Sequence, residues 1–227
     1  MTTPARILIL SGAGRYSDPW HPYVETSGAL GDILRELPDT DVRISEDADA
    51  ALTNLSGVDL LVVNTGNPAE NGEAAGSVDD AQRAAVSAAV RSFRSAGGSL
   101  LVTHSGTSSL PEYPEIVELM PARWTPESWH PEFGEVDLPV SPGHPITDGL
   151  KRIAADDELY SGLVVDPDAE VLLAHELDGT RHPLILATEH DGTRVVVDAL
   201  GHDARSYLSA SHRHLLQQAG EWLLRRR

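Results

Sequence analysis

The N-terminal half of the chain alternates short apolar runs with longer segments of helical periodicity. Continuous aliphatic runs are typical of strands buried on both faces, and apolar positions repeated every three or four residues predict amphipathic helices. The predicted strands are 6–11, 41–45, 58–63 and 99–103, and the predicted helices are 22–37 and 78–96. This alternation favours a parallel sheet with right-handed crossovers.

After Met120 the chain carries several short strand-like segments joined by Gly, Pro or Asp turns. The predicted strands are 135–140, 169–175, 183–188 and 194–200, and a predicted helix over 209–224 closes the chain. A run of strands without helices between them favours an antiparallel extension of the sheet. We find no repeat, linker or low-complexity segment. The sequence therefore predicts one α/β domain over residues 1–227, with a mostly parallel sheet flanked by helices and an antiparallel extension in its C-terminal half.

Three polar loops follow predicted parallel strands: SGAGRYSDPWH, NTGNP and HSGTSS. The second belongs to a Gly- and Asn-rich loop predicted over 64–77. Ligands of open α/β sheets bind at the carboxyl ends of strands. We therefore expect these loops to share one rim of the sheet and to form the binding site.

The chain is strongly acidic, with 35 Asp and Glu against 17 Lys and Arg and a formal net charge of −18. It has no basic patch, which argues against nucleic acid and anionic membrane as partners. No segment approaches the ~18 apolar residues of a membrane span, and the N-terminal apolar run is too short for a signal peptide. We therefore expect a cytoplasmic protein.

Cysteine is absent, which excludes disulfides, thiolate catalysis and cysteine-ligated zinc. No GxGxxG or Walker pattern indicates a nucleotide cofactor. Histidine is frequent instead, with 10 residues. His21, His104, His130 and His202 all lie in predicted loops that could converge on the rim. Clustered neutral imidazoles suit one divalent transition metal such as zinc, or acid–base chemistry near pH 7.

The spacing of these four histidines matches no metal-binding motif, so each of them could also be structural. The remaining histidines are predicted to order a turn (His144) or to lie at the surface or at strand edges (His175, His182, His190, His212 and His214).

Ser105 follows the fourth predicted strand, where a nucleophile elbow would place its serine. The elbow pattern requires glycine two residues before and after the serine, and both positions are threonine here, Thr103 and Thr107. Asp157 and His202 follow in the order that a Ser-Asp-His triad would need. The favoured interpretation is that Ser105 caps the next helix, and a serine nucleophile is the alternative.

An acidic triplet, 156–158, precedes Leu159 and Tyr160. It is either a solvated turn or a source of a general base, a metal ligand or an acceptor for sugar hydroxyls. Three of the four tryptophans, Trp20, Trp124 and Trp129, lie near His21 or His130 in the sequence. Their rings could stack on a sugar or belong to the core.

The chain resembles the trehalose-utilisation (ThuA-like) proteins in five segments, which are ILILSGAGRYSDPWHPYVETSGAL, GGSLLVTHSGT, GHPITDGL, DDELY and GHDARSY. These proteins form a branch of the class I glutamine amidotransferase-like superfamily with a flavodoxin-like fold. The glutaminases of that superfamily carry a cysteine where this chain has His104, and ThuA-like proteins similarly carry a histidine there. The chain departs from the family by Val102 and Thr103 before this histidine and Ser105 after it.

The resemblance implies sugar catabolism, notably of disaccharides or oxidised (3-keto) glycosides. The absence of cysteine excludes thiolate-dependent glutamine hydrolysis. The site residues that it implies are His21, His104, His130, Glu158, Tyr160, His202 and Asp203.

The first hypothesis is an enzyme that acts on a small sugar or polyol. His104 or His202 would be the acid–base group, Glu158 a second carboxylate or a ligand, and Asp203 would orient His202. Substrate contacts are expected from Trp20, His21, Ser105, Trp129, His130 and Tyr160, and a metal would be held by His21, His104, His130 and His202. The alternatives are a non-catalytic sugar-binding or regulatory protein and a serine hydrolase. We also expect a homodimer as the commonest form of a soluble oligomer.

Overall fold

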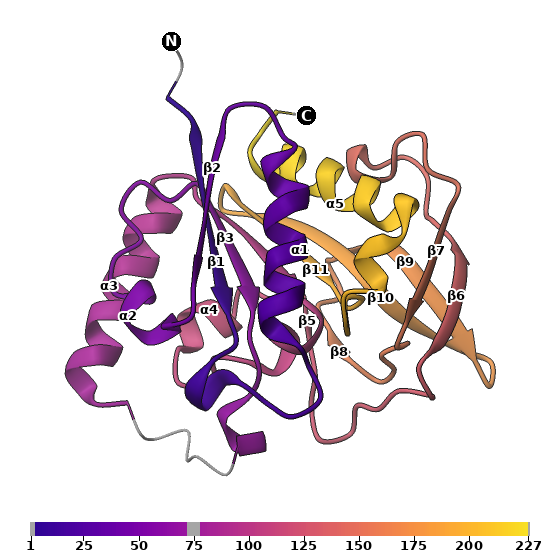
Figure 1. Cartoon of the computed structure of the whole chain (residues 1–227), viewed down its shortest axis with the longest axis horizontal. Helices are drawn as coiled ribbons and strands as arrows, with labels where there is room; N and C mark the ends of the chain where they lie inside the picture. The colour runs from indigo at the N-terminus through magenta and orange to yellow at the C-terminus, as the bar shows by residue number, and fades with distance from the viewer. Residues whose placement is uncertain (1–2, 72–77, 227) are drawn as a thin grey trace.

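The computed structural model describes residues 3–71 and 78–226. Its centre is a seven-stranded sheet (Figure 1). The strands are β1 Ala5–Ser11, β2 Thr40–Ser45, β3 Leu60–Asn64, β4 Ser99–Thr103, β9 Glu170–Leu177, β10 Thr180–His190 and β11 Thr193–Asp198. They lie in the order β2-β1-β3-β4-β11-β10-β9. Each strand predicted in the N-terminal half is present within a few residues of its predicted bounds.

The first five strands in this order, β2 to β11, run parallel, which confirms the predicted mostly parallel sheet. Only β10 runs against its neighbours β11 and β9, which gives the predicted antiparallel extension, although β11, predicted as part of it, also pairs parallel with β4. Two-residue Asp-Gly turns at 178–179 and 191–192 have positive φ at both positions and reverse the chain twice. The third strand of this meander, β11, therefore runs in the direction of β4.

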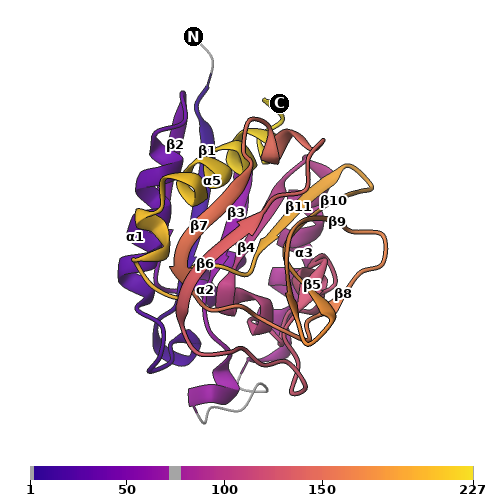
Figure 2. The same cartoon turned by 90° about the vertical axis from the view of Figure 1, so that its right-hand side faces the viewer.

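Helices cover both faces of the sheet (Figures 1 and 2). The helices α1 Tyr23–Arg35 and α5 Ala210–Leu223 pack on one face, and α2 Ala48–Leu52, α3 Asp80–Ser95 and α4 Pro114–Val117 lie on the other. Side chains of β3 alternate between the two cores, with Leu60 and Val62 toward α1 and α5, and Leu61 and Val63 toward α3. Burial on both faces explains why the central strands are continuous aliphatic runs.

An outer hairpin brings the acidic triplet to the sheet. Strand β6, Gly134–Pro139, pairs antiparallel with β7, Arg152–Asp157, in a separate two-stranded sheet. The expectation that the segment 135–140 joins the main sheet is therefore wrong, apart from one bridge between Val140 and Leu173. A second small sheet pairs β5, Ala122–Arg123, with β8, Val164–Val165.

In the predicted loop 64–77, Pro68–Asn71 forms a 3-10 helix, and residues 72–77 lie outside the described residues. Within the described ranges, no helix has the length and apolar character needed to cross a bilayer.

Candidate metal and substrate site

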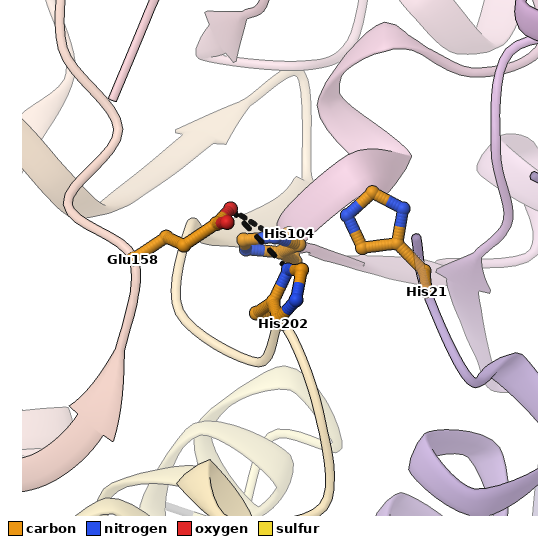
Figure 3. A group of neighbouring side chains, drawn as sticks. All are labelled: His21, His104, Glu158 and His202. Atoms are coloured by element: carbon orange, nitrogen blue, oxygen red, sulfur yellow. Dashed lines mark ion pairs between the residues drawn. The ribbon is translucent and has the colours of Figure 1, made fainter. Parts of the chain in front are cut away.

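The functional side chains come from loops that follow β1, β4, β7 and β11. They carry His21, His104, Glu158 and His202, which point toward one another (Figure 3). His21, Glu158 and His202 line a cleft of about 760 Å³, and His104 is buried beside it. The loops after β1, β4 and β11 leave the main sheet at its carboxyl edge, and the outer hairpin supplies Glu158. Four segments that are distant in sequence thus meet at one rim.

His104 occupies a sharp turn between β4 and the 3-10 helix His104–Ser108. Its φ of 44° lies in the left-handed region, which costs a non-glycine residue about 1–3 kcal/mol. The turn also needs Gly106, because a Cβ there would lie 2.6 Å from the carbonyl oxygen of Val63. The backbone therefore forms an elbow although Thr103 and Thr107 replace the glycines of the serine-hydrolase pattern.

The His104 ring is fixed in one tautomer. Its Nδ1 donates to the Ala199 carbonyl at 2.9 Å, so Nε2 carries the lone pair of the neutral ring. Nε2 lies 3.4 Å from Oε2 of Glu158. A lone pair and a carboxylate oxygen repel one another, and a proton or a cation between the two groups would make this approach favourable.

His21 is oriented by Asp18, three residues earlier. Its Nδ1 lies 2.8 Å from both Asp18 oxygens, which also accept the Tyr23 hydroxyl at 2.5 Å and the backbone N–H groups of Trp20 and His21. An anionic carboxylate only accepts, so Nδ1 is the protonated nitrogen. Nε2 of His21 is then free to bind a cation.

His202 presents its Nδ1 to the same oxygen of Glu158 at 3.3 Å. The backbone of this loop is held by the buried Asp157, which accepts the N–H groups of Gly201 at 2.7 Å and His202 at 3.1 Å. The sequence interpretation considered Asp157 only as a member of an acidic triplet or of a triad.

The charges of the site shift one another's pKa values. Burial raises the pKa of the Glu158 carboxyl. The His104 and His202 imidazoles outweigh this effect and bring the pKa well below its usual range. Burial lowers the pKa of His202, and the Glu158 carboxylate overcomes this effect and raises it. Burial and the neighbouring His104 and His202 rings lower the pKa of His21 despite Asp18. At pH 7 Glu158 is anionic and His21 neutral, which are the forms that bind metals.

This donor set fits a transition metal. One ligand-capable atom from each of His21, His104, Glu158 and His202 lies within 4.8 Å of all the others. Nε2 of His104 and Nδ1 of His202 are buried and form no hydrogen bond within the described residues, although Oε2 of Glu158 lies 3.4 and 3.3 Å from them. Metal-bound histidines usually donate their other N–H to a carboxylate or a carbonyl, as His21 and His104 do here. Imidazole and carboxylate donors suit a divalent ion such as zinc.

His130, the fourth histidine expected in a metal set, lies to one side of the cluster. Its Nδ1 donates to the Pro131 carbonyl at 2.9 Å and lies 3.6 Å from Oε1 of Glu158. Its side chain is 38% exposed, and its ring faces Trp124 and Tyr160. The structure therefore places Glu158, and not His130, with the three central histidines.

Aromatic rings form one wall of the cleft. The Tyr160 ring lies 4.3 Å from the His104 ring and 4.4 Å from the Trp124 ring. Trp20 also lines the cleft and is largely exposed. Trp129 does not line it, since its ring faces outward against His182. Trp124 takes the place that was assigned to Trp129.

Two further roles differ from the sequence interpretation. Ser105 lines the cleft but caps no helix, because its hydroxyl contacts the Tyr23 hydroxyl at 3.0 Å and the Thr65 carbonyl at 3.4 Å. The predicted orientation of His202 by Asp203 is also wrong. The Asp203 carboxylate instead binds the Arg205 guanidinium at 2.5 and 2.9 Å.

The other histidines are divided between core and surface. His175 and His212, expected at the surface or at strand edges, are buried, and His212 binds Asp198 at 2.7 Å. His144 orders a turn as expected, since its Nδ1 accepts the N–H of Ile146.

Sequence reasoning missed Asp18, Tyr23 and Asp157 as parts of the site. A signal for Asp18 was available, because an Asp followed three residues later by a His places the carboxylate within reach of the imidazole across a turn. Tyr23 and Asp157 gave no comparable signal, since the contacts that join Tyr23 to Ser105, and Asp157 to Gly201 and His202, connect residues distant in sequence.

Residues 6–223 match the sequence model of the family described as ThuA, trehalose utilisation. The chain belongs to the ThuA family. The resemblance inferred from the five segments is thereby confirmed. A comparison with curated proteins gave no match.

Solved structures agree with this assignment. A ThuA-like protein from Parabacteroides merdae has a TM-score of 0.77 at 18% identity, over 97% of this chain and 90% of that one. A second ThuA-like protein, from Bacteroides uniformis, has a TM-score of 0.72 at 16% identity, over 98% and 93%. A glutamine amidotransferase from Thermotoga maritima has a TM-score of 0.56 at 10% identity, over 97% and 98%. At these identities the similarity shows the fold, which is flavodoxin-like as expected.

Proposed function

We propose that this ThuA-family protein is an enzyme of sugar utilisation that acts on a disaccharide, glycoside or keto-sugar with a bound divalent transition metal. The observation that carries the proposal is the cluster of His21, His104, Glu158 and His202, with two buried imidazole nitrogens that lack hydrogen bonds. The family assignment supplies the link to sugars. A cleft of about 760 Å³ lies in the range of pockets for small organic ligands.

The metal would be held by the free nitrogens of His21, His104 and His202, with Oε2 of Glu158 as a further donor. When bound, the ion would polarise a carbonyl or hydroxyl oxygen of the sugar. The second oxygen of Glu158, Oε1, would accept a proton from the substrate. His130 lines the same cleft, but its Nδ1, the nitrogen 3.6 Å from Oε1, already donates to the Pro131 carbonyl, so the ring would contact the substrate and would not take up that proton.

The charge of the cleft favours an uncharged substrate. The carboxylates that line it are Asp18, Glu70 and Glu158, and no Lys or Arg lies among the described lining residues. Sites for phosphorylated sugars use Arg, Lys or helix N-termini to bind the phosphate. The rings of Trp20, Trp124 and Tyr160 offer apolar surface for a neutral sugar.

The first test is metal content by elemental mass spectrometry, on protein purified without a histidine tag and without chelator. About one zinc, manganese or nickel ion per chain is expected in the wild type, and a much lower content in His104→Ala. His190→Ala, which removes an exposed histidine, is the matched control. A wild type that binds none of these ions after incubation would contradict the metal-assisted proposal.

The second test is turnover of neutral glycosides and keto-sugars by the metal-loaded protein. Product formation that is lost in Glu158→Gln is expected. Thermal stabilisation by a sugar without any product would instead identify a non-catalytic sugar-binding protein.

A further inference from the structure

Asp157 is a buried carboxylate that contacts two of the loops that form the cleft. It is the last residue of β7 and is 1% exposed. Its Oδ2 accepts the N–H of Gly201 at 2.7 Å, and its Oδ1 accepts the N–H of His202 at 3.1 Å and of Glu158 at 2.8 Å. All three donors are backbone groups of residues in or beside the proposed metal site.

These hydrogen bonds connect two separate sheets. Glu158 follows β7 of the outer hairpin, whereas Gly201 and His202 follow β11 of the main sheet. No strand pairing joins β7 to β11, so the distance between Glu158 and His202 depends on contacts between loops. Asp157 holds the backbone on both sides of this gap, whereas the other hydrogen bonds from β7 to this part of the chain join Ala154 to the hydroxyls of Ser209 and Ser211, further from the site.

The loop that Asp157 holds requires glycine at position 201. Gly201 has a φ of 113°, which disfavours other residues, and a Cβ there would collide with the Tyr207 hydroxyl. With its N–H groups bound to Asp157, this loop presents Nδ1 of His202 3.3 Å from Glu158. The hydrogen bonds therefore fix the backbone from which one proposed ligand projects.

We propose that Asp157 is a positioning residue that sets the separation of Glu158 and His202 and thereby the affinity of the site for its metal. The inference rests on the proposed function for its metal readout, and on the hydrogen bonds alone for its structural readout. Groups that orient metal ligands typically contribute 10- to 100-fold to metal affinity.

The Asp157→Asn variant tests this role. Its amide has the shape of the carboxylate but only one acceptor oxygen. If that oxygen takes the Oδ1 position, the Gly201 N–H faces an NH₂ group, and if it takes the Oδ2 position, the N–H groups of His202 and Glu158 do. Either orientation loses at least one of the three hydrogen bonds.

The experiment combines two measurements. Co²⁺ serves as the probe of affinity, titrated by its visible absorption into metal-free protein, and amide hydrogen exchange follows Gly201 and His202 in the same metal-free protein. In Asp157→Asn we expect a Co²⁺ dissociation constant about 10- to 100-fold higher, together with faster exchange of both amides.

Two controls separate positioning from general loss of stability. Asp156→Asn changes the exposed neighbour in the same triplet and is expected to match the wild type in both measurements. Val86→Ala creates a small cavity under α3, away from the cleft, and is expected to lower the Tm without changing Co²⁺ affinity. If Asp157→Asn does not fold, Asp157→Glu replaces it, with the same charge and acceptors displaced by one methylene.

Asp157→Asn or Asp157→Glu with wild-type Co²⁺ affinity would overturn the inference, whatever the exchange rates. A wild type that binds no Co²⁺ would contradict the proposed function instead. Exchange of the Gly201 and His202 amides would then test the positioning role by itself. Faster exchange in the variant would support that role, and unchanged rates would overturn it as well.

Discussion

Replacing Arg15 is expected to lower the stability of the fold more than replacing an exposed charged residue does. Arg15 follows β1 and donates to Asp49 at 2.9 and 3.0 Å and to Glu112 at 2.6 Å. Its side chain is only 11% exposed, and that of Glu112 is fully buried. Tyr16 and Tyr113 add hydroxyl contacts to Asp49. Burial and the hydrogen bond to the Asp49 carboxylate raise the pKa of Tyr113 to about 12. The cluster joins the loop that leads to His21 with α2 and with the segment after β4.

The Arg15→Met variant keeps most of the apolar stem and removes the charge. Glu112 then remains buried without its cation, and breaking such a pair costs about 3–5 kcal/mol. For a chain of this length, each kcal/mol lowers the Tm by about 2–4 °C. The expected decrease in Tm is therefore about 6–20 °C.

Thermal unfolding followed by far-ultraviolet circular dichroism measures this effect. Arg35→Met, which removes an exposed ion pair with Asp32, is the control and should cost less than about 1 kcal/mol. The double variant Arg15→Met/Glu112→Gln should regain part of the lost stability, because no unpaired charge stays at position 112. A Tm of Arg15→Met within about 3 °C of the wild type, or no recovery in the double variant, would refute the reasoning.

Three further predictions concern the site and the core beside it. His104→Ala should lower metal affinity at least 10- to 100-fold, whereas His130→Ala should keep the metal and lose turnover; elemental analysis beside a rate assay distinguishes the two. Burial lowers the pKa of His212, but Asp198 raises it above its usual value. The stabilisation from this pair is therefore complete below pH about 6.5 and is lost as pH rises through the raised pKa. Urea unfolding at pH 6 and pH 9 should show the wild type losing its advantage over His212→Gln at the higher pH, and a constant difference would contradict this. Ser105→Ala should keep turnover, and the wild type should resist labelling by a fluorophosphonate, since a serine nucleophile predicts the opposite in both assays.

The central strands could be predicted because their environment leaves a strong pattern. Strands β1, β3 and β4 are covered by helices on both faces, so almost every residue of them is aliphatic. Strand β7 was not predicted, because its sequence RIAADD buries only alternate residues, among them Ala155 and Asp157. Small and acidic side chains at buried positions do not give the apolar signal of a strand.

The site could be predicted as a set of loops but not as a set of distances. Strand order places the loops of His21, His104 and His202 on one rim, since the carboxyl ends of parallel strands share an edge. The membership of the central cluster also depends on the outer hairpin. This hairpin brings Glu158 to the place that was predicted for His130. Because Asp203 is adjacent to His202 in the sequence, we predicted that its carboxylate orients that ring. The carboxylate instead binds the Arg205 guanidinium, which is a stronger hydrogen-bond donor.

The elbow at His104 separates backbone geometry from side-chain chemistry. The left-handed turn is held by the close approach of Gly106 to β3 and by the hydrogen bond from the Thr107 hydroxyl to the His104 carbonyl, and neither contact involves the imidazole. The turn can therefore persist when the residue at its apex changes. The resemblance places the catalytic cysteine of glutaminases at this position, and this chain has there the histidine that we propose as a metal ligand, so one substitution would change the chemistry while the scaffold is retained. This is one way in which a fold shared with glutamine amidotransferases can evolve a different reaction without being rebuilt.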